Sequence, residues 1–204
     1  ELNDEKVVRE IVKEGPKRLE ELLSLGAKFD TSTDESGREF LDMTKEGGHS
    51  ARRVLHAGGD ATGKEIERAL SEAIKRNEYI RIYENTFVID LIIDDNNVCR
   101  GVIAKRENHL FVIWSDSVII ATGGIGQLYR ETTNPRFSTG DGHSIAYRAG
   151  VIMQDLEFVQ FHPTTLYIAG SSRILITEAL RGEGAILRNR EGQRFMPNYH
   201  PQAD

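Results

Sequence analysis

The sequence has few of the residues that brace small secreted domains, and it has no long apolar run. Cys99 is its single cysteine among 204 residues, which excludes an internal disulfide framework and a cysteine metal cluster. Its apolar runs stay well short of the roughly 20 residues that a membrane-spanning helix needs. Such cysteine usage is typical of reducing compartments. We therefore expect a cytoplasmic protein without a membrane span.

An excess of basic residues is also missing, because 26 Lys and Arg stand against 32 Asp and Glu, for a net charge of -6. Nucleic-acid binding depends on Lys and Arg contacts to phosphates, so no nucleic-acid partner is expected. The first residues, from Glu1, are charged and resemble neither a signal nor a transit peptide. They do not begin with methionine, so we expect a longer protein to which this chain belongs.

Several short fingerprints are absent. The sequence contains neither the G-x-G-x-x-G turn of dinucleotide-binding domains nor a phosphate-binding P-loop. It also lacks the G-x-S-x-G elbow of serine hydrolases. A zinc site from His49, His56 and Asp60 is conceivable, but this spacing matches no familiar zinc signature, so no metal is expected.

Apolar spacing predicts two helices near the start of the chain. The first covers residues 7–23, with Pro16 dividing or kinking it and Gly26 ending it. The second follows Thr62 and buries a face between residues 66 and 74. Thr62 and Glu65 have the spacing of a capping box, in which each side chain bonds the other residue's backbone amide.

The following segment reads as strands, because β-branched and aromatic residues alternate or form short apolar runs. We predict strands at residues 79–83, 87–93, 99–104, 110–114 and 117–121, and a turn at residues 94–97. A helix is expected at residues 143–149. A buried strand, a glycine turn and a helix in this order indicate an α/β sheet that contacts a ligand where the strand ends. The composition changes past Asp155, where we place a domain boundary.

Two glycine-containing motifs could contact a ligand. Thr122, Gly123 and Gly124 follow the last predicted strand, where glycine lets the backbone approach a bulky group; an ordinary tight turn is the alternative. Asp141 lies between two glycines at the start of the next helix. Its carboxylate could cap that helix, which is the more common role, or bind ligand hydroxyl groups.

Two later motifs could line an active site. His162 lies near the predicted domain boundary, where ligand clefts tend to form, although a lone histidine is more often structural. Thr177 and Glu178 follow, and residues 178–184 alternate carboxylates with Arg181. That alternation fits either a surface salt-bridge network or the polar wall of a site for an anionic substrate.

In their fixed order these motifs resemble the flavoprotein family of succinate dehydrogenases, fumarate reductases and L-aspartate oxidases. The motifs are residues 121–124, 133–135, 139–142, 157–164 and 175–185, and the resemblance covers nearly the whole chain. It implies an α/β fold: residues 1–155 are part of a Rossmann-like FAD-binding domain of the glutathione-reductase type, without its G-x-G-x-x-G unit. Residues 156–204 would open an α+β domain that caps the substrate.

One segment resembles the aspartate-oxidizing branch of this family. Residues 45–56 contain Glu46, at a position where the succinate and fumarate relatives typically lack a glutamate. A carboxylate aimed at the α-amino group favours aspartate and is left unpaired against succinate, which has no amine. The loop containing Gly58 and Gly59 is one residue longer than is usual in the family.

The resemblance implies FAD-dependent oxidation of L-aspartate to iminoaspartate, the first step towards quinolinate and NAD. FAD would be bound non-covalently, with oxygen or fumarate as the electron acceptor. L-aspartate or another C4-dicarboxylate would be the substrate, and quinolinate synthase is a candidate partner. The alternatives are a soluble fumarate reductase or succinate dehydrogenase flavoprotein, and a module that has kept the fold but lost flavin.

The resemblance also assigns roles to individual residues of this chain. Glu46, which would orient the substrate amine, and His162 would be catalytic. The substrate would contact His162, Thr177 and Glu178, and the cofactor would contact four residues: Val88, Thr122, Gly123 and Asp141. The family's catalytic arginine would lie beyond Asp204, so we expect this chain alone to be inactive.

Overall fold

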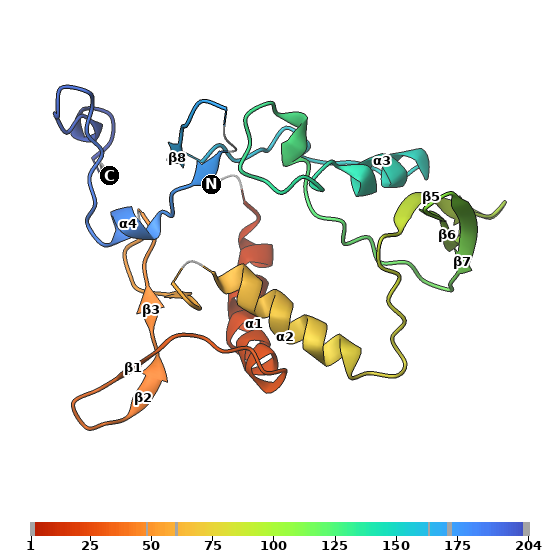
Figure 1. The fold of residues 1–204 in the computed structure, drawn as a ribbon, viewed down its shortest axis with the longest axis horizontal. Coiled ribbons are helices and arrows are strands. Elements are labelled where there is room, and N and C mark those ends of the chain that lie inside the picture. Colours follow the sequence, from red (N-terminus) through yellow and green to blue (C-terminus); the bar gives the residue numbers. More distant parts are fainter. Residues whose placement is uncertain (1–2, 48, 60, 163, 171–172, 202–204) are drawn as a thin grey trace. The chain divides into compact units, whose positions relative to one another are not determined.

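The computed structural model describes residues 3–47, 49–59, 61–162, 164–170 and 173–201. Gly48, Asp60 and Pro163, which belong to motifs discussed above, lie outside the described residues. The chain forms two compact units (Figure 1). Unit 1 comprises Glu1–Arg81 and Thr177–Asp204, and unit 2 comprises Ile82–Ile176. The domain boundary near Asp155 stays a prediction.

Unit 1 opens with helix α1 (Glu5–Ser24), which confirms the first predicted helix. Asp4 caps it, because its side chain accepts from the backbone N–H groups of the first turn. Pro16 does not divide the helix, contrary to one of the two outcomes predicted for it. The helix stops as expected at Gly26, whose φ of 95° belongs to the left-handed region. Ala27 there donates to the Leu22 carbonyl, which closes the end of the helix.

Two short antiparallel hairpins follow α1. In the first, β1 (Thr31–Thr33) pairs with β2 (Glu39–Leu41), and residues 34–38 join the two strands. In the second, β3 (Met43–Thr44) pairs with β4 (Val54–Leu55), with Thr44 opposite Val54. The antiparallel register therefore places residues just after Thr44 beside residues just before Val54.

Helix α2 (Thr62–Lys75) forms where it was predicted and contacts α1, but the predicted capping box is wrong. The Thr62 hydroxyl accepts from the Ala57 N–H instead of capping the helix. Glu65 accepts from the Lys28 N–H at 2.7 Å and pairs with Arg68 at 2.6 Å. Because a neighbouring segment and a cation supply donors, the Glu65 carboxylate does not turn back to the helix start.

The carboxy-terminal part of unit 1 contains helix α4 (Ala179–Gly182) and the 3-10 turn η2 (Met196–Asn198). Gly182 packs directly against the backbone of the loop after β3, because a Cβ on Gly182 would overlap the carbonyl oxygen of Lys45. This close approach holds residues far apart in sequence together within unit 1.

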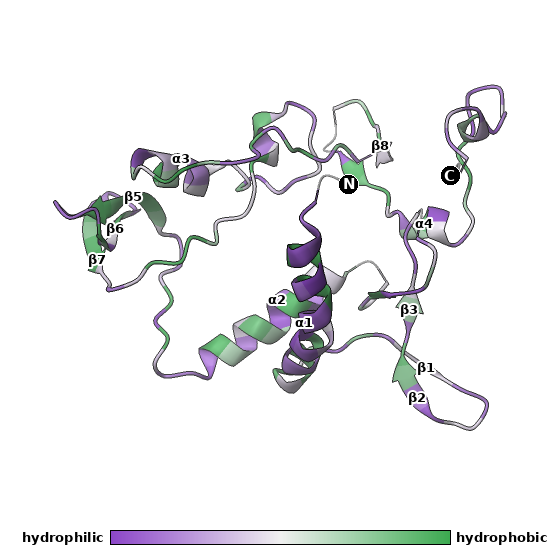
Figure 2. Cartoon of the chain, turned by 180° about the vertical axis from the view of Figure 1, so that it is seen from behind, coloured by the Kyte–Doolittle hydropathy of each residue, from purple (hydrophilic) through white to green (hydrophobic). Residues whose placement is uncertain are grey.

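Unit 2 is built on an antiparallel sheet in the order β5-β6-β7. The strands are β5 (Phe87–Ile93), β6 (Cys99–Arg106) and β7 (His109–Trp114), and all three confirm predicted strands. The predicted turn at residues 94–97 is also confirmed. These strands are largely hydrophobic (Figure 2). The α3 helix (Asp141–Arg148) contacts β5, where Arg148 pairs with Asp90 at 2.9 Å.

Two predicted strands are wrong, since residues 79–83 and 117–121 have no strand structure. Both have strand composition, but a strand needs a neighbour to complete its hydrogen-bond ladder. Neither segment has such a neighbour among the described residues. Ile119 accordingly stays 90% exposed.

The rest of unit 2 consists of short elements. The 3-10 turn η1 (Gly126–Leu128) precedes α3, while β8 (Thr165–Leu166) and β9 (Ile174–Leu175) form a two-stranded antiparallel pair. Across the described part of the chain, no helix combines the length and apolar content that crossing a membrane requires.

Candidate functional site

Unit 1 contains a cavity of about 490 Å³ that joins the β3–β4 hairpin to the segment before α4. We call it the unit 1 cavity. Its lining includes polar side chains from three parts of the sequence: Thr44, Glu46, His56, Thr62 and Thr177. Glu46 and Thr177, which were predicted to belong to one site, thus line one cavity.

Glu46 reaches this cavity because it lies two residues beyond the end of β3. Its own N–H faces the exposed His49, whose Nδ1 lies 3.3 Å away. The carboxylate atom Oε2 is buried, and no donor among the described residues bonds it. A buried oxygen acceptor without a donor is costly, so this atom is suited to a ligand that supplies one.

His56 lines the same cavity, and its ring lies close to two carboxylates. Its Nε2 lies 3.5 Å from Asp30 Oδ2 and 3.9 Å from Asp42 Oδ2. Asp30 also accepts from the N–H groups of Gly58 and Gly59. These two bonds, with the nearby imidazole, hold the pKa of Asp30 below its ordinary value.

The other ring nitrogen of His56, Nδ1, is buried and has no hydrogen-bond partner among the described residues. His56 entered the sequence analysis only within the motif at residues 45–56 and in the conceivable zinc site. Side chains alternate between the two faces of a strand, so Val54 and His56 share a face, as do Asp42 and Thr44 on the opposite strand. This pattern is the signal that could have placed His56 beside Glu46.

Glu178, predicted to contact substrate, precedes α4 and pairs with Arg181 at 2.9 Å. The Arg181 guanidinium in turn packs against Gly47, next to Glu46. Glu183 pairs with Arg52 at 2.9 Å. Charged residues 178–183 therefore form ion pairs within unit 1, of which the Glu183–Arg52 pair is exposed and the Glu178–Arg181 pair largely buried.

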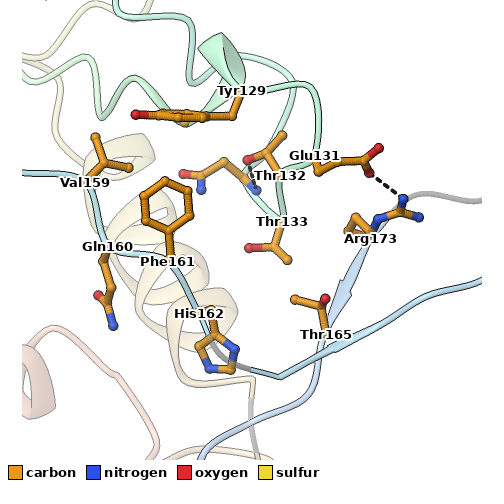
Figure 3. Close-up of a pocket in the computed structure, with 12 residues that line it drawn as sticks. Tyr129, Glu131, Thr132, Thr133, Val159, Gln160, Phe161, His162, Thr165 and Arg173 are labelled. Atoms are coloured by element: carbon orange, nitrogen blue, oxygen red, sulfur yellow. Dashed lines mark hydrogen bonds and ion pairs between the residues drawn. The ribbon is translucent and has the colours of Figure 1, made fainter.

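Unit 2 has a separate pocket of about 240 Å³, lined by residues that include Tyr129, Phe161, His162 and Arg173 (Figure 3). We call it the unit 2 pocket. Glu131 and Arg173 form an ion pair across its wall, with 2.5 Å between Oε2 and Nη2. Arg173 also stacks over the Tyr167 ring, 4.2 Å from its centre.

His162 lies at this pocket, and its imidazole is fixed by the chain that follows it. Nδ1 lies 2.9 Å from the Thr164 carbonyl oxygen and 3.2 Å from the Thr164 backbone nitrogen. The structure thus places His162 in unit 2, while Glu46 and Thr177 lie in unit 1.

Three of the predicted cofactor contacts gather at the start of α3. The loop at Thr122 and Gly123 is exposed, and a Cβ on Gly142 of α3 would overlap the Thr122 hydroxyl. Gly140 N–H donates to the Gly124 carbonyl, which ties the loop to the helix start. Val88, the fourth residue, is half-buried in β5 opposite Ala104.

Asp141 does not cap α3, so the more common of its two roles is wrong. Gly140 occupies the cap position with a left-handed φ of 76°, and no side chain bonds the helix amides there. The Asp141 carboxylate instead accepts from the Thr139 hydroxyl at 2.7 Å.

The conceivable zinc site is not assembled by the described residues. His49 and His56 make the separate contacts given above, and no group of three or more metal-binding side chains occurs in the described part of the chain. Asp60 lies outside that part.

The chain belongs to the FAD binding domain family, which it matches over residues 1–204. The prediction of an α/β FAD-binding fold is therefore confirmed.

Within this family, the similar curated proteins are L-aspartate oxidases. The chain is 46% identical over 211 residues to L-aspartate oxidase from Streptomyces coelicolor, covering 100% of this chain and 36% of that protein. It is 43% identical over 216 residues to L-aspartate oxidase 2-b, chloroplastic, from Nicotiana tabacum, covering 100% of this chain and 33% of that protein. The chain thus spans about a third of the length of these relatives.

Among solved structures, the chain resembles quinol fumarate reductase from E. coli, with a TM-score of 0.84 and 33% sequence identity. The match covers 98% of this chain and 34% of that chain. The predicted resemblance to the joint family of aspartate oxidases and fumarate reductases is therefore confirmed.

Proposed function

We propose that the protein containing this chain is an L-aspartate oxidase, which oxidizes L-aspartate to iminoaspartate with FAD as cofactor and oxygen or fumarate as electron acceptor. The observation that carries the proposal is the buried Glu46 Oε2, which has no donor among the described residues that surround the unit 1 cavity. The names of the relatives point to the same reaction.

Glu46 gives the cavity a preference for an amine. L-aspartate carries an ammonium group that can donate to the Glu46 carboxylate, whereas succinate would leave the buried charge without a partner. Hydrogen bonds to charged groups are worth about 1.5–3 kcal/mol, and stranding a buried charge costs more. This difference is large enough to separate two dicarboxylates of similar size.

Thr177 and His162 are proposed to hold the substrate carboxylates. The Thr177 hydroxyl oxygen accepts from the Ala179 N–H at 3.3 Å, so its own proton is available to donate into the unit 1 cavity. His162 is oriented by its contacts with Thr164. Glu178 already pairs with Arg181, and we propose that this pair supports the wall beside Glu46.

The residues at the start of α3 fit a flavin nucleotide. A Cβ on Gly123 would meet open space, and the exposed backbone there lets a flat ligand approach closely. Asp141 could accept a ligand hydroxyl, and Val88 would contribute an apolar contact. Bound FAD supplies the acceptor for the hydride, while this chain's residues bind and orient the substrate.

The test is Glu46→Gln in the full gene product loaded with FAD. We expect kcat/KM for L-aspartate to fall by about 10–100-fold, because a charged hydrogen bond becomes a neutral one. Fumarate reduction should stay within about 2–3-fold, because fumarate has no amine to lose.

Glu183→Gln is the matched control, because it removes a carboxylate that pairs with Arg52 at the surface of unit 1. It should leave both activities close to wild type. Equal losses of both activities in Glu46→Gln would show that Glu46 does not read the amine.

A second candidate is a fumarate reductase or succinate dehydrogenase flavoprotein, favoured by the likeness to the E. coli fumarate reductase. The steady-state rates of the wild-type protein separate the two. Faster turnover of succinate than of L-aspartate would refute the oxidase proposal.

A cytoplasmic location and a partnership with quinolinate synthase are further parts of the proposal. The single cysteine supports a reducing compartment. A chloroplast is an alternative location, because the Nicotiana relative is named as a chloroplast protein. An enzyme that consumes iminoaspartate would gain from proximity to its source. Co-purification from the native cell tests the partnership.

A further inference from the structure

Two residues that line the unit 1 cavity each have a buried side-chain atom that no described residue satisfies. One is Glu46 Oε2 and the other is His56 Nδ1. Native proteins satisfy most buried polar side-chain atoms, so two such atoms in the lining of one cavity indicate a missing ligand group or water. The chemistry of both atoms identifies the group.

The surroundings of His56 decide which ring nitrogen carries the proton. Nε2 faces Asp30 and Asp42 at 3.5 and 3.9 Å, and ionised carboxylates only accept hydrogen bonds. In the neutral imidazole a lone pair on Nε2 would be repelled by both oxygens, so the tautomer with its proton on Nε2 is favoured. In that tautomer Nδ1 is an acceptor.

Both unsatisfied atoms therefore call for donors. A substrate carboxylate has none, and it would be repelled by Glu46. An ammonium group has three N–H donors, which is enough to serve Glu46 Oε2, His56 Nδ1 and one further acceptor. A second acceptor at this point also fixes the direction of the amine, which a single carboxylate does not.

We propose that His56 is a second binding residue for the substrate ammonium group, with Nδ1 accepting an N–H that Glu46 does not use. This inference rests on the proposed oxidation of an amino acid and adds a specificity-determining residue to it. Asp30 and Asp42 act behind His56 as positioning residues, because they fix which nitrogen faces the amine.

A matched pair of variants separates this role from a purely structural one. The side-chain amide of Gln lies where histidine has Nε2, so His56→Gln keeps a donor towards Asp30 and Asp42 but removes the acceptor at Nδ1. The amide of Asn lies where histidine has Nδ1, so His56→Asn keeps that acceptor but gives up the two aspartates.

The measurement is the Kd of L-aspartate and of succinate for the FAD-loaded full gene product, taken without oxygen and with the flavin already reduced so that no turnover occurs. We expect His56→Gln to raise the Kd of L-aspartate by about 10-fold, as for a lost charged hydrogen bond. The Kd of succinate should change by less than about 3-fold, and His56→Asn should bind L-aspartate more tightly than His56→Gln does.

Three results would overturn the proposal: unchanged L-aspartate affinity in His56→Gln, equal loss of both ligands, or weaker L-aspartate binding in His56→Asn than in His56→Gln. The last would assign His56 to the support of Asp30 and Asp42. A wild-type protein that fails to oxidize L-aspartate would instead refute the proposed function itself.

A second measurement needs no variant, in case both substitutions prevent folding. In wild-type protein labelled with ¹⁵N-histidine, one unprotonated Nδ1 resonance should shift when L-aspartate binds and stay in place with succinate. If no Nδ1 resonance distinguishes the two ligands, His56 does not bind the amine.

Discussion

The unit 1 cavity and the unit 2 pocket both have polar side chains in their linings, but they satisfy these groups in different ways. In the unit 1 cavity, Glu46 Oε2 and His56 Nδ1 are buried without partners among the described residues. In the unit 2 pocket, Glu131 pairs with Arg173, and the imidazole of His162 bonds the Thr164 backbone. Thr164, which does not line this pocket, has a buried hydroxyl without a hydrogen-bond partner among the described residues.

Paired and unpaired polar groups contribute differently to ligand binding. Groups that already bond one another hold a pocket in shape, but they offer little that distinguishes one ligand from another. Unsatisfied buried acceptors do distinguish ligands, because they reward only a group that donates. We therefore propose that Glu46 and His56 of unit 1 determine the choice of an amino acid.

The largest expected effect comes from Gly182→Ala, which tests whether the unit 1 cavity depends on close backbone packing. A Cβ on Gly182 would overlap the Lys45 carbonyl oxygen, and backbone atoms cannot move aside as a flexible side chain can. We expect a loss of about 1–3 kcal/mol in the free energy of unfolding, measured by denaturant titration, and strongly reduced L-aspartate turnover.

Gly15→Ala is its control, because a Cβ on this α1 glycine meets nothing within 4 Å and alanine is a better helix former. It should be neutral or stabilizing. If Gly182→Ala were equally harmless, the approach of α4 to the loop after β3 would not define the cavity.

A smaller effect is expected from His162→Ala, which tests the proposed binding of a carboxylate by His162. Turnover of L-aspartate and reduction of fumarate should both fall, each by about 10–100-fold, because both ligands carry carboxylates. The exposed His109 of β7 provides the control, and His109→Ala should leave both rates unchanged. Normal kinetics in His162→Ala would reduce His162 to a structural role.

The smallest expected effect is a loss of stability at acidic pH through Glu65. Bonds from Arg68 and the Lys28 N–H lower the pKa of Glu65 from 4.5 to about 2. A lowered pKa in the folded state means that the stabilization is complete above pH 4.5 and is lost as the pH falls towards 2. The contacts of Glu65 with Lys28 and Arg68 should therefore weaken across this window.

Glu65→Gln checks this expectation, because the variant has no carboxylate to titrate. Its far-ultraviolet circular dichroism should fall less steeply than that of wild type between pH 4.5 and 2. Replacement of the exposed Glu67 on the same helix by glutamine should leave the acid profile of wild type in place. Identical profiles for Glu65→Gln and wild type would contradict the assignment.

Local patterns predicted the elements whose structure is decided locally. Helices α1 and α2 and strands β5 to β7 follow from apolar spacing, and the Gly26 stop follows from glycine's access to positive φ. Residues 117–121 were mistaken for a strand because composition reports the tendency to extend. It does not report whether a neighbouring strand exists.

The functional site likewise contains residues that the sequence predicted and residues that it did not. Glu46 and Thr177 are far apart in sequence, and the resemblance of motifs, rather than any local pattern, placed them in one site. His56 was not assigned to that site, because its environment depends on Asp30 and on the pairing of β3 with β4. Glu65 was misread for a related reason, since its donors come from Lys28 and Arg68.

Asp30 bonds the turn at Gly58 and Gly59 and also faces His56. One side chain therefore links the length of a surface loop to the orientation of a ring inside the cavity. We therefore expect a change in the length of this loop to alter the orientation of the imidazole, even where Glu46 and His56 are unchanged.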